Sequence, residues 1–170
     1  MLRFISSGKK SVFLKVFLVC AAVTVGVVAD AGGLTFEQLA ALRSARGAVI
    51  SPDGSLIAYT LSVPRRPGVD EDGGNWSELH VVSVEKGVDR TFVGGEVSVS
   101  GVQFSPDGKL ITYLAKRHGD DHKALWAIPV SGGESRKVMA FDTEIEDYEL
   151  SPDGAKVAFV AKQPECKERK

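Results

Sequence analysis

Apolar and polar residues alternate around a turn that occurs three times in the chain. An apolar residue directly precedes each turn, and two more follow its last glycine by three and five residues. In chain order these residues are Ile50, Ile57 and Tyr59, then Phe104, Ile111 and Tyr113, then Leu150, Val157 and Phe159. Residues two apart face the same side of a β-strand. The pattern therefore predicts paired strands with one buried stripe in each repeat.

The turn itself is Ser-Pro-Asp-Gly, at residues 51–54, 105–108 and 151–154. This order fits a type I turn, with proline preset for the second position and glycine free to adopt positive φ at the end. Such a turn joins two antiparallel strands. Three copies indicate a structural repeat rather than a chance match.

A second block repeats with an offset of 46 residues. Residues 79–84, followed by Gly87 and Arg90, align with residues 125–130, followed by Gly133 and Arg136. We interpret this block as a third strand, a glycine turn and a fourth strand. The first and second turns are 54 residues apart, so the eight extra residues of the first unit fall in the loop at 62–77. Repeat architectures tolerate an insertion confined to a loop.

Four strands in a period near 46 predict an all-β fold, an incomplete β-propeller with two four-stranded blades plus part of a third. A β-sandwich is the alternative, but it does not predict a repeated motif. The third unit passes into a polar segment after Ala161. We therefore expect a fragment or truncated product that is marginally stable by itself and prone to form oligomers.

A short helix is predicted ahead of the blades, within a linker at residues 32–47, so that the partial propeller would occupy 48–170. Thr35 is placed to cap this helix, with Gln38 at the capping-box position. Leu34 and Leu39 are spaced as a hydrophobic staple. Gly47 is expected to end the helix.

The first 31 residues differ from the rest. Four basic residues and no acid precede an apolar run at 16–29, and Ala29-Asp30-Ala31 follows. This order predicts a signal peptide at 1–31 and a secreted or periplasmic protein. Retention as a signal anchor is the alternative, although the run is shorter than the roughly 20 residues that span a bilayer. A lipoprotein site at Cys20 is a weaker possibility.

Charge and cysteine content narrow the function classes. Cleavage removes four of the 21 basic residues and one of the 22 acidic ones, which leaves an acidic chain. We expect no nucleic-acid partner and no stable membrane anchor. Cys166 would be the one remaining cysteine, so no internal disulfide is expected.

The repeated turn, the leading helix and the segment at 125–134 (Leu-Trp-Ala-Ile-Pro-Val-Ser-Gly-Gly-Glu) resemble the start of the prolyl oligopeptidase family of serine peptidases. The acylaminoacyl-peptidase and dipeptidyl-peptidase branches are the most similar, and the resemblance spans residues 34–161. It implies a propeller that admits short peptide substrates to a C-terminal α/β-hydrolase domain with a Ser-Asp-His triad.

That catalytic domain is not expected in this chain. A Gly-x-Ser-x-Gly elbow does not occur, and the nearest stretch, at 94–101, lacks the spacing and is interpreted as a linker between blades. We assign no catalytic, cofactor-binding or metal residue, and we expect this chain to hydrolyse nothing by itself. The alternative is a non-enzymatic, periplasmic propeller similar to TolB that binds protein partners, although TolB carries a small α/β domain before its propeller.

Three polar segments and one pair of arginines are candidate sites. His118-Gly119-Asp120-Asp121-His122 offers two imidazoles and two carboxylates for a metal, but a solvated loop is the favoured interpretation. Residues 70–75 are rich in oxygen ligands for calcium, yet they break the ligand alternation, so an insertion loop is favoured. Asn75-Trp76-Ser77 matches a glycosylation acceptor. Arg90 and Arg136 share a repeat position, where a structural role in the fourth strand is favoured over substrate contact.

Overall fold

The computed structural model describes residues 33–117 and 119–163. The chain divides into two units, residues 1–35 and 36–170. The described part of the first unit, residues 33–35, has no helix or strand, and the elements described below belong to the second unit. The predicted signal peptide lies outside the described residues, and so does His118. No helix in the described ranges is long and apolar enough to cross a membrane.

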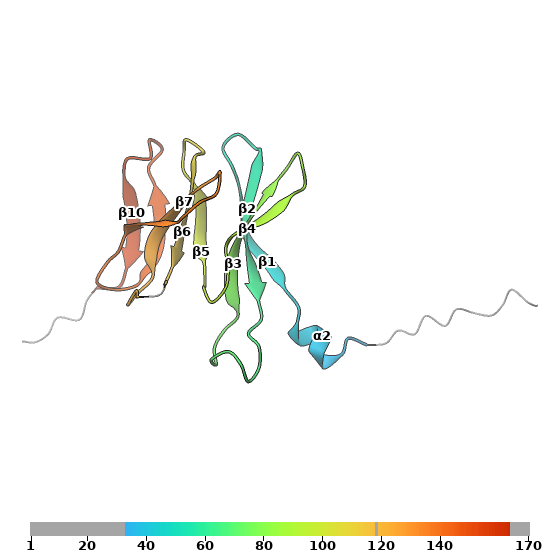
Figure 1. Ribbon diagram of the computed structural model, residues 1–170. Coiled ribbons are helices and arrows are strands. Elements are labelled where there is room, and N and C mark those ends of the chain that lie inside the picture. The colour runs from blue at the N-terminus through green and yellow to red at the C-terminus, as the bar shows by residue number, and fades with distance from the viewer. Residues whose placement is uncertain (1–32, 118, 164–170) are drawn as a thin grey trace, which may run out of the picture. The chain divides into compact units, whose positions relative to one another are not determined.

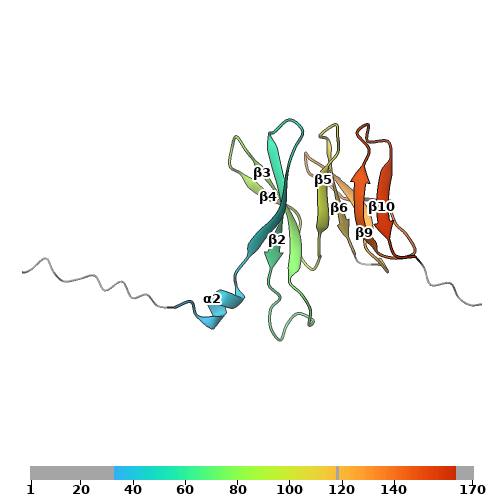
Figure 2. The same ribbon diagram turned by 180° about the vertical axis from the view of Figure 1, so that it is seen from behind.

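In the described residues, ten strands form three antiparallel sheets that stand side by side (Figures 1 and 2). The first sheet contains β1 (Ser44–Ile50), β2 (Leu56–Val63), β3 (Trp76–Ser83) and β4 (Asp89–Val93). The second contains β5 (Ser100–Phe104), β6 (Leu110–Ala115), β7 (Ala124–Pro129) and β8 (Arg136–Met139). The third contains β9 (Ile145–Leu150) and β10 (Val157–Ala161). Strands follow one another within each sheet, so the prediction of two four-stranded blades plus part of a third is confirmed.

The Ser-Pro-Asp-Gly segments form the predicted turns between the first and second strands of each blade. In the first turn, the Gly54 amide donates to the Ser51 carbonyl at 2.8 Å, and Gly54 has a φ of 74°. The Ser51 hydroxyl donates to Asp53 Oδ1 at 2.6 Å and accepts from the Leu56 amide at 2.9 Å. The other two turns repeat these bonds. Serine and aspartate therefore satisfy backbone groups that the turn leaves without partners.

Successive turns also lie next to each other at one end of the blades. A methyl group placed on Gly108 would lie 3.7 Å from Pro52 Cδ, and one placed on Gly154 would lie 3.6 Å from Pro106 Cδ. The glycines of the second and third turns therefore pack beside the proline of the preceding turn. The repeated motif fixes the spacing between blades as well as the turn within each blade.

The core lies between neighbouring blades. Ala58, Leu79 and Val81 of the first blade pack with Ile111 and Tyr113 of the second, and all five are buried. A second cluster joins the second blade to the third through Leu114, Leu125, Ile145 and Tyr148. The second blade is therefore covered on both faces, and most of its central strands β6 and β7 are buried.

The prediction of one buried stripe in every repeat is right only for the second blade. Ile111 and Tyr113 are fully buried because they face the first blade. The equivalent residues of the first blade, Ile57 and Tyr59, are half-buried, since no described blade covers that face. In the third blade Val157 packs between sheets, whereas Phe159 remains 38% exposed.

A short helix precedes the strands, as predicted, but its predicted staple and its predicted end are wrong. The helix α2 (Phe36–Ala40) is five residues long and buries no side chain, and Leu34 and Leu39 of the predicted staple are exposed. Gly47 does not end it, because β1 begins at Ser44, inside the segment predicted as linker and helix. The backbone of residues 44–50 satisfies its hydrogen bonds by pairing with β2 instead.

Gly47 instead forms a bulge in β1, where the pairing register shifts between Arg46 and Val49 and φ is 59°. Gly101 does the same in β5, with a φ of 57° at a shift between Ser100 and Gln103. The two glycines are 54 residues apart, which is the spacing of the first two turns. They are therefore a repeat position of the blades.

Candidate functional site

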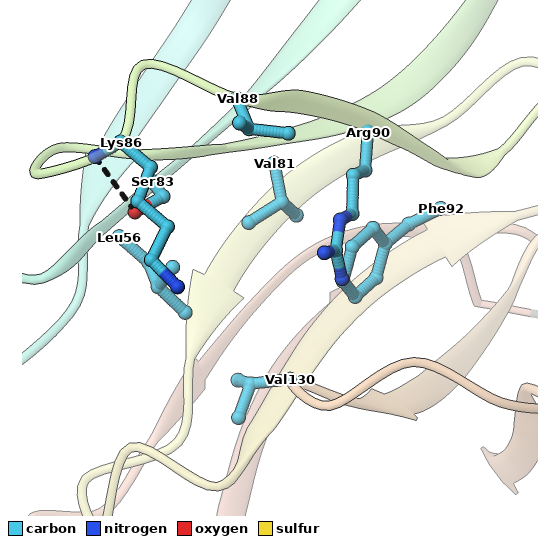
Figure 3. A pocket seen from close by; sticks show the side chains of 8 residues that line it. All are labelled: Leu56, Val81, Ser83, Lys86, Val88, Arg90, Phe92 and Val130. Atoms are coloured by element: carbon cyan, nitrogen blue, oxygen red, sulfur yellow. Dashed lines mark hydrogen bonds between the residues drawn. The ribbon is translucent and has the colours of Figure 1, made fainter.

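A small pocket opens at the outer part of the boundary between the first two blades, at the end where the Ser-Pro-Asp-Gly turns lie. Its volume is about 160 Å³. Val81 and Phe92 of the first blade and Val130 of the second provide apolar lining (Figure 3). Lys86 lies in the turn between β3 and β4, and Arg90 lies on β4. We refer to these residues, with Leu56, Ser83 and Val88, as the interblade pocket.

Strand pairing explains why these side chains meet. Val81 is paired directly with Arg90, and Leu56 with Ser83, so each pair lies on one face of the sheet. Val81 is buried against the second blade, which places Arg90 on the same face. The Val130 amide donates to the Lys109 carbonyl at 3.0 Å, and this bond holds Val130 on the facing blade. The blade architecture therefore builds the pocket.

The pocket carries two positive charges and no negative one. Within the described ranges, no hydrogen bond or ion pair is made by the Lys86 ammonium or the Arg90 guanidinium, and both side chains are exposed. The Ser83 hydroxyl accepts from the Lys86 amide at 3.3 Å, which leaves its own proton free to be donated. Three donor groups thus adjoin an apolar surface, an arrangement suited to an anion with an apolar substituent.

The repeat shows that these features belong to the first blade alone among the two complete ones. With the offset of 46 residues, Lys86 corresponds to Gly132 and Arg90 to Arg136. Val88 corresponds to Glu134, and Phe92 to Val138. The second blade therefore keeps the arginine but replaces the lysine with glycine, the aromatic ring with valine and one apolar residue with an acid.

Arg90 and Arg136 do occupy equivalent positions, as the repeat predicted, because Arg90 pairs with Val81 and Arg136 with Ala127. Sequence reasoning favoured a structural role for both, and it missed Lys86, Ser83 and Phe92 altogether. A signal was present in the sequence, since Lys86 in the first blade is replaced by Gly132 at the equivalent repeat position of the second. The sequence does not show that the β3–β4 hairpin faces Val130 of the second blade.

Residues 119–122, the described part of the segment at 118–122, form a loop, as favoured. Asp120 accepts from the Arg117 amide at 3.2 Å and pairs with the Lys137 ammonium. Burial raises the pKa of Asp120, but these partners outweigh it and the net shift is downward. His122 and Asp121 are exposed, and no cluster of metal-ligating side chains occurs in the described part of the chain.

The segment at 70–75 is organised around an arginine. The Arg65 guanidinium donates to the Glu71 carbonyl and the Gly74 carbonyl, both at 2.7 Å, and lies 3.7 Å from the centre of the Trp76 ring. Asp70 pairs with Arg66 at 2.9 Å. Two carbonyls of the predicted loop and its first carboxylate thus already have cationic partners. The paired strands extend to Val63 and Trp76, so the loop is residues 64–75.

Two further polar side chains of the first blade, Asn75 and His80, have hydrogen-bonding partners. Asn75 Nδ2 donates to Ser62 Oγ at 3.1 Å on an exposed part of the hairpin, and glycosylation there stays a prediction. His80 Nδ1 lies 3.0 Å from Asp89 Oδ2, and Nε2 lies 3.4 Å from Glu78 Oε2. Because both ring nitrogens face carboxylates, His80 is not arranged as the base of a serine nucleophile.

No family model matches the chain, and no curated protein matches it. Several solved structures match the chain. The structure reported as TolB from Agrobacterium tumefaciens is 24% identical over 75% of this chain and 41% of its own, with a TM-score of 0.54. An acylaminoacyl peptidase from Pyrococcus horikoshii is 16% identical over 77% of this chain and 19% of its own, with a TM-score of 0.58.

An acylaminoacyl peptidase in complex with Z-Gly-Gly-Phe-chloromethyl ketone is 17% identical over the same shares, with a TM-score of 0.60. The fold is that of a β-propeller. At these identities the comparison shows the fold alone, and the chain spans less than half the length of each of these proteins.

Proposed function

We propose that this chain is the N-terminal propeller portion of an exported serine peptidase and helps to admit short peptides to a catalytic α/β-hydrolase domain. The observation that carries the proposal is the likeness of 77% of this chain to acylaminoacyl peptidases, at TM-scores of 0.58 and 0.60. The repeated turn and the segment at 125–134, which resemble the same family, support it independently of the backbone comparison.

The arrangement of the first strands suits such a role. β1 and β5 contact each other, and β1 leaves most of its side chains exposed. In a propeller the first strand of each blade lines the central channel. Exposed side chains on β1 can therefore contact a peptide that passes along the channel.

The test is an assay of the full-length product of the gene on aminoacyl chromogenic peptides, beside the 170-residue chain. We expect turnover by the full-length protein, a downstream Gly-x-Ser-x-Gly elbow followed by Asp and His, and no turnover by this chain. A reading frame that ends after its last blade would refute the peptidase proposal. Turnover by the pure 170-residue chain would contradict the assignment of catalysis to another domain.

A second candidate is a non-enzymatic, TolB-like propeller that binds protein partners in the periplasm. The identity of 24% to the Agrobacterium tumefaciens protein favours it. The two candidates differ in the downstream sequence, since only the first requires a hydrolase domain. Both require export, which fractionation of cells producing the tagged protein would test.

A further inference from the structure

The interblade pocket combines two cations with an apolar lining, and nothing in the described chain neutralises them. An arginine guanidinium presents two parallel N–H donors that match a carboxylate, and charge-assisted bonds of this kind are stronger than neutral ones. Lys86 and Ser83 add donors on the same side of the pocket. In Figure 3, Lys86 and Arg90 both extend from the β3–β4 hairpin toward Val130 of the second blade.

The size of the pocket limits what can enter. Its volume of about 160 Å³ is close to that of an apolar cavity of about 150 Å³ that holds benzene. It therefore accommodates one side chain and a carboxylate, and not an extended peptide. Val81, Phe92 and Val130 make the inner lining apolar, so the side chain that fits is apolar too.

We propose that the interblade pocket binds the C-terminal residue of a peptide, with its α-carboxylate between Lys86 and Arg90 and its apolar side chain against Val81, Phe92 and Val130. A C-terminal residue suits the pocket because one carbon atom separates its carboxylate from its side chain. The rest of the peptide would leave through the open side. The inference goes beyond the proposed function, since neither a peptidase nor a TolB-like protein requires a site between these blades.

The second blade offers a matched control within the same chain. Arg136 is the repeat equivalent of Arg90 and is equally exposed, but it has Gly132 in place of Lys86 and Glu134 in place of Val88. A single arginine beside an acid does not retain a carboxylate in the way that two unopposed cations do. Arg136→Gln should therefore leave binding unchanged.

The experiment measures binding of a fluorescent pentapeptide that ends in leucine to the 170-residue chain, by anisotropy at low salt. We expect Arg90→Gln and Lys86→Gln each to weaken binding about tenfold or more, as loss of one charge-assisted hydrogen bond predicts. Amidation of the peptide C-terminus should cause a comparable loss. Arg136→Gln should have less than a twofold effect.

Several outcomes would overturn the proposal: equal binding of the amidated peptide, equal weakening by Arg136→Gln, or no binding at all. Hexanoate that competes as well as the peptide would show that a simple fatty carboxylate suffices and would also reject it. Thermal unfolding of each variant separates loss of binding from loss of folding. If Arg90→Gln unfolds the chain, Lys86→Gln, in an exposed turn, still decides the question. Neither catalysis nor a downstream domain enters the measurement.

Discussion

Each residue of the first Ser-Pro-Asp-Gly turn meets a different requirement of the backbone. Pro52 fixes φ, and Gly54 adopts the positive φ that other residues avoid. The Ser51 hydroxyl bonds the Leu56 amide, while Asp53 accepts from Ser51 and from the Ser55 amide and hydroxyl. The donated bonds from Ser51 and Ser55 lower the pKa of Asp53 to about 2.

This shift makes stability depend on pH. The pKa of Asp53 is depressed in the folded state, so its contribution is present above the unfolded value of about 3.9 and is lost as pH falls toward 2. We expect Asp53→Asn to be less stable than the wild-type chain at pH 7, and the gap to narrow as pH approaches 2. Urea unfolding across this range checks it, with Asp121→Asn, in an exposed loop, as control. A gap that does not change with pH would contradict the prediction.

The two bulge glycines allow a second prediction at this scale. Both have a φ near 60°, so Gly47→Ala and Gly101→Ala should each cost about 1–2 kcal/mol in unfolding free energy. Gly101→Ala should cost more, because its added carbon would lie 3.3 Å from Tyr148 Cε1, whereas that of Gly47 finds only Thr60 Oγ1, at 3.8 Å. Denaturant unfolding of the pair tests this. Equal losses would mean that the Tyr148 ring moves aside freely.

At the scale of elements, the boundary between the second and third blades depends on one buried tyrosine. The Tyr148 hydroxyl lies 2.7 Å from the Gly101 carbonyl and 2.7 Å from Thr112 Oγ1. Gln103 adds a bond from its side-chain amide to the Tyr148 carbonyl at 2.9 Å. Burial raises the pKa of Tyr148, so the phenol stays protonated and donates. The half blade is thus joined to the second blade by hydrogen bonds as well as apolar packing.

Tyr148→Phe should reduce the unfolding free energy by about 1–3 kcal/mol, since it leaves a buried carbonyl without this partner. Tyr59→Phe is the control, because the Tyr59 hydroxyl contacts Asp89 at 3.2 Å near the surface. We expect the control to change stability by less than half as much. Hydrogen exchange of the β9 and β10 amides would show whether the loss is local. A neutral Tyr148→Phe would mean that apolar packing alone holds the third blade.

The sequence could predict those elements whose structure depends on residues that are close together in the chain. The turns and the strand order followed from residue type and spacing, because each turn is built from its own side chains. The linker predicted at 94–101 is shorter than expected, since β5 begins at Ser100. Gly47 was misassigned because a glycine after a helical pattern and a glycine in a bulge look alike until the pairing partner is known. The sequence could not predict that Ile57 is half-buried while Ile111 is fully buried. The two residues occupy the same repeat position and differ only in whether a neighbouring blade covers them.

The same distinction explains the interblade pocket. Arg90 stood out because it repeats, whereas Lys86 and Phe92 matter because they do not repeat. A comparison of repeat positions does not identify residues that differ between the blades. Their meeting with Val130 depends on how two blades pack, which strand patterns leave open.

At the scale of the whole molecule, the third sheet has two strands in the described residues. One edge of β10 is unpaired there, whereas the equivalent strands β2 and β6 are paired on both sides. β10 pairs with β9 on one side only, and Val160 is 58% exposed on the face opposite Phe159. Unpaired edges favour association with a second chain. We expect the 170-residue chain to self-associate at micromolar concentration.

Val160→Lys should weaken this association about tenfold, because burying one valine contributes about 1.5 kcal/mol. Val138→Lys is the control, since Val138 is similarly exposed on the outer strand of the second blade. Sedimentation equilibrium measures both variants. Equal effects, or a wild-type chain that remains monomeric, would argue against β10 as the contact.

Because successive turns pack against each other, the two ends of the blades differ in how well they tolerate an inserted peptide. Because Gly108 packs beside Pro52 and Gly154 beside Pro106, a peptide grafted into any of these turns would push its neighbour out of place. The loop at 64–75 lies at the opposite end (Figure 1), and it is longer than the loop between β6 and β7 of the second blade. An epitope or affinity tag displayed there should leave the scaffold intact.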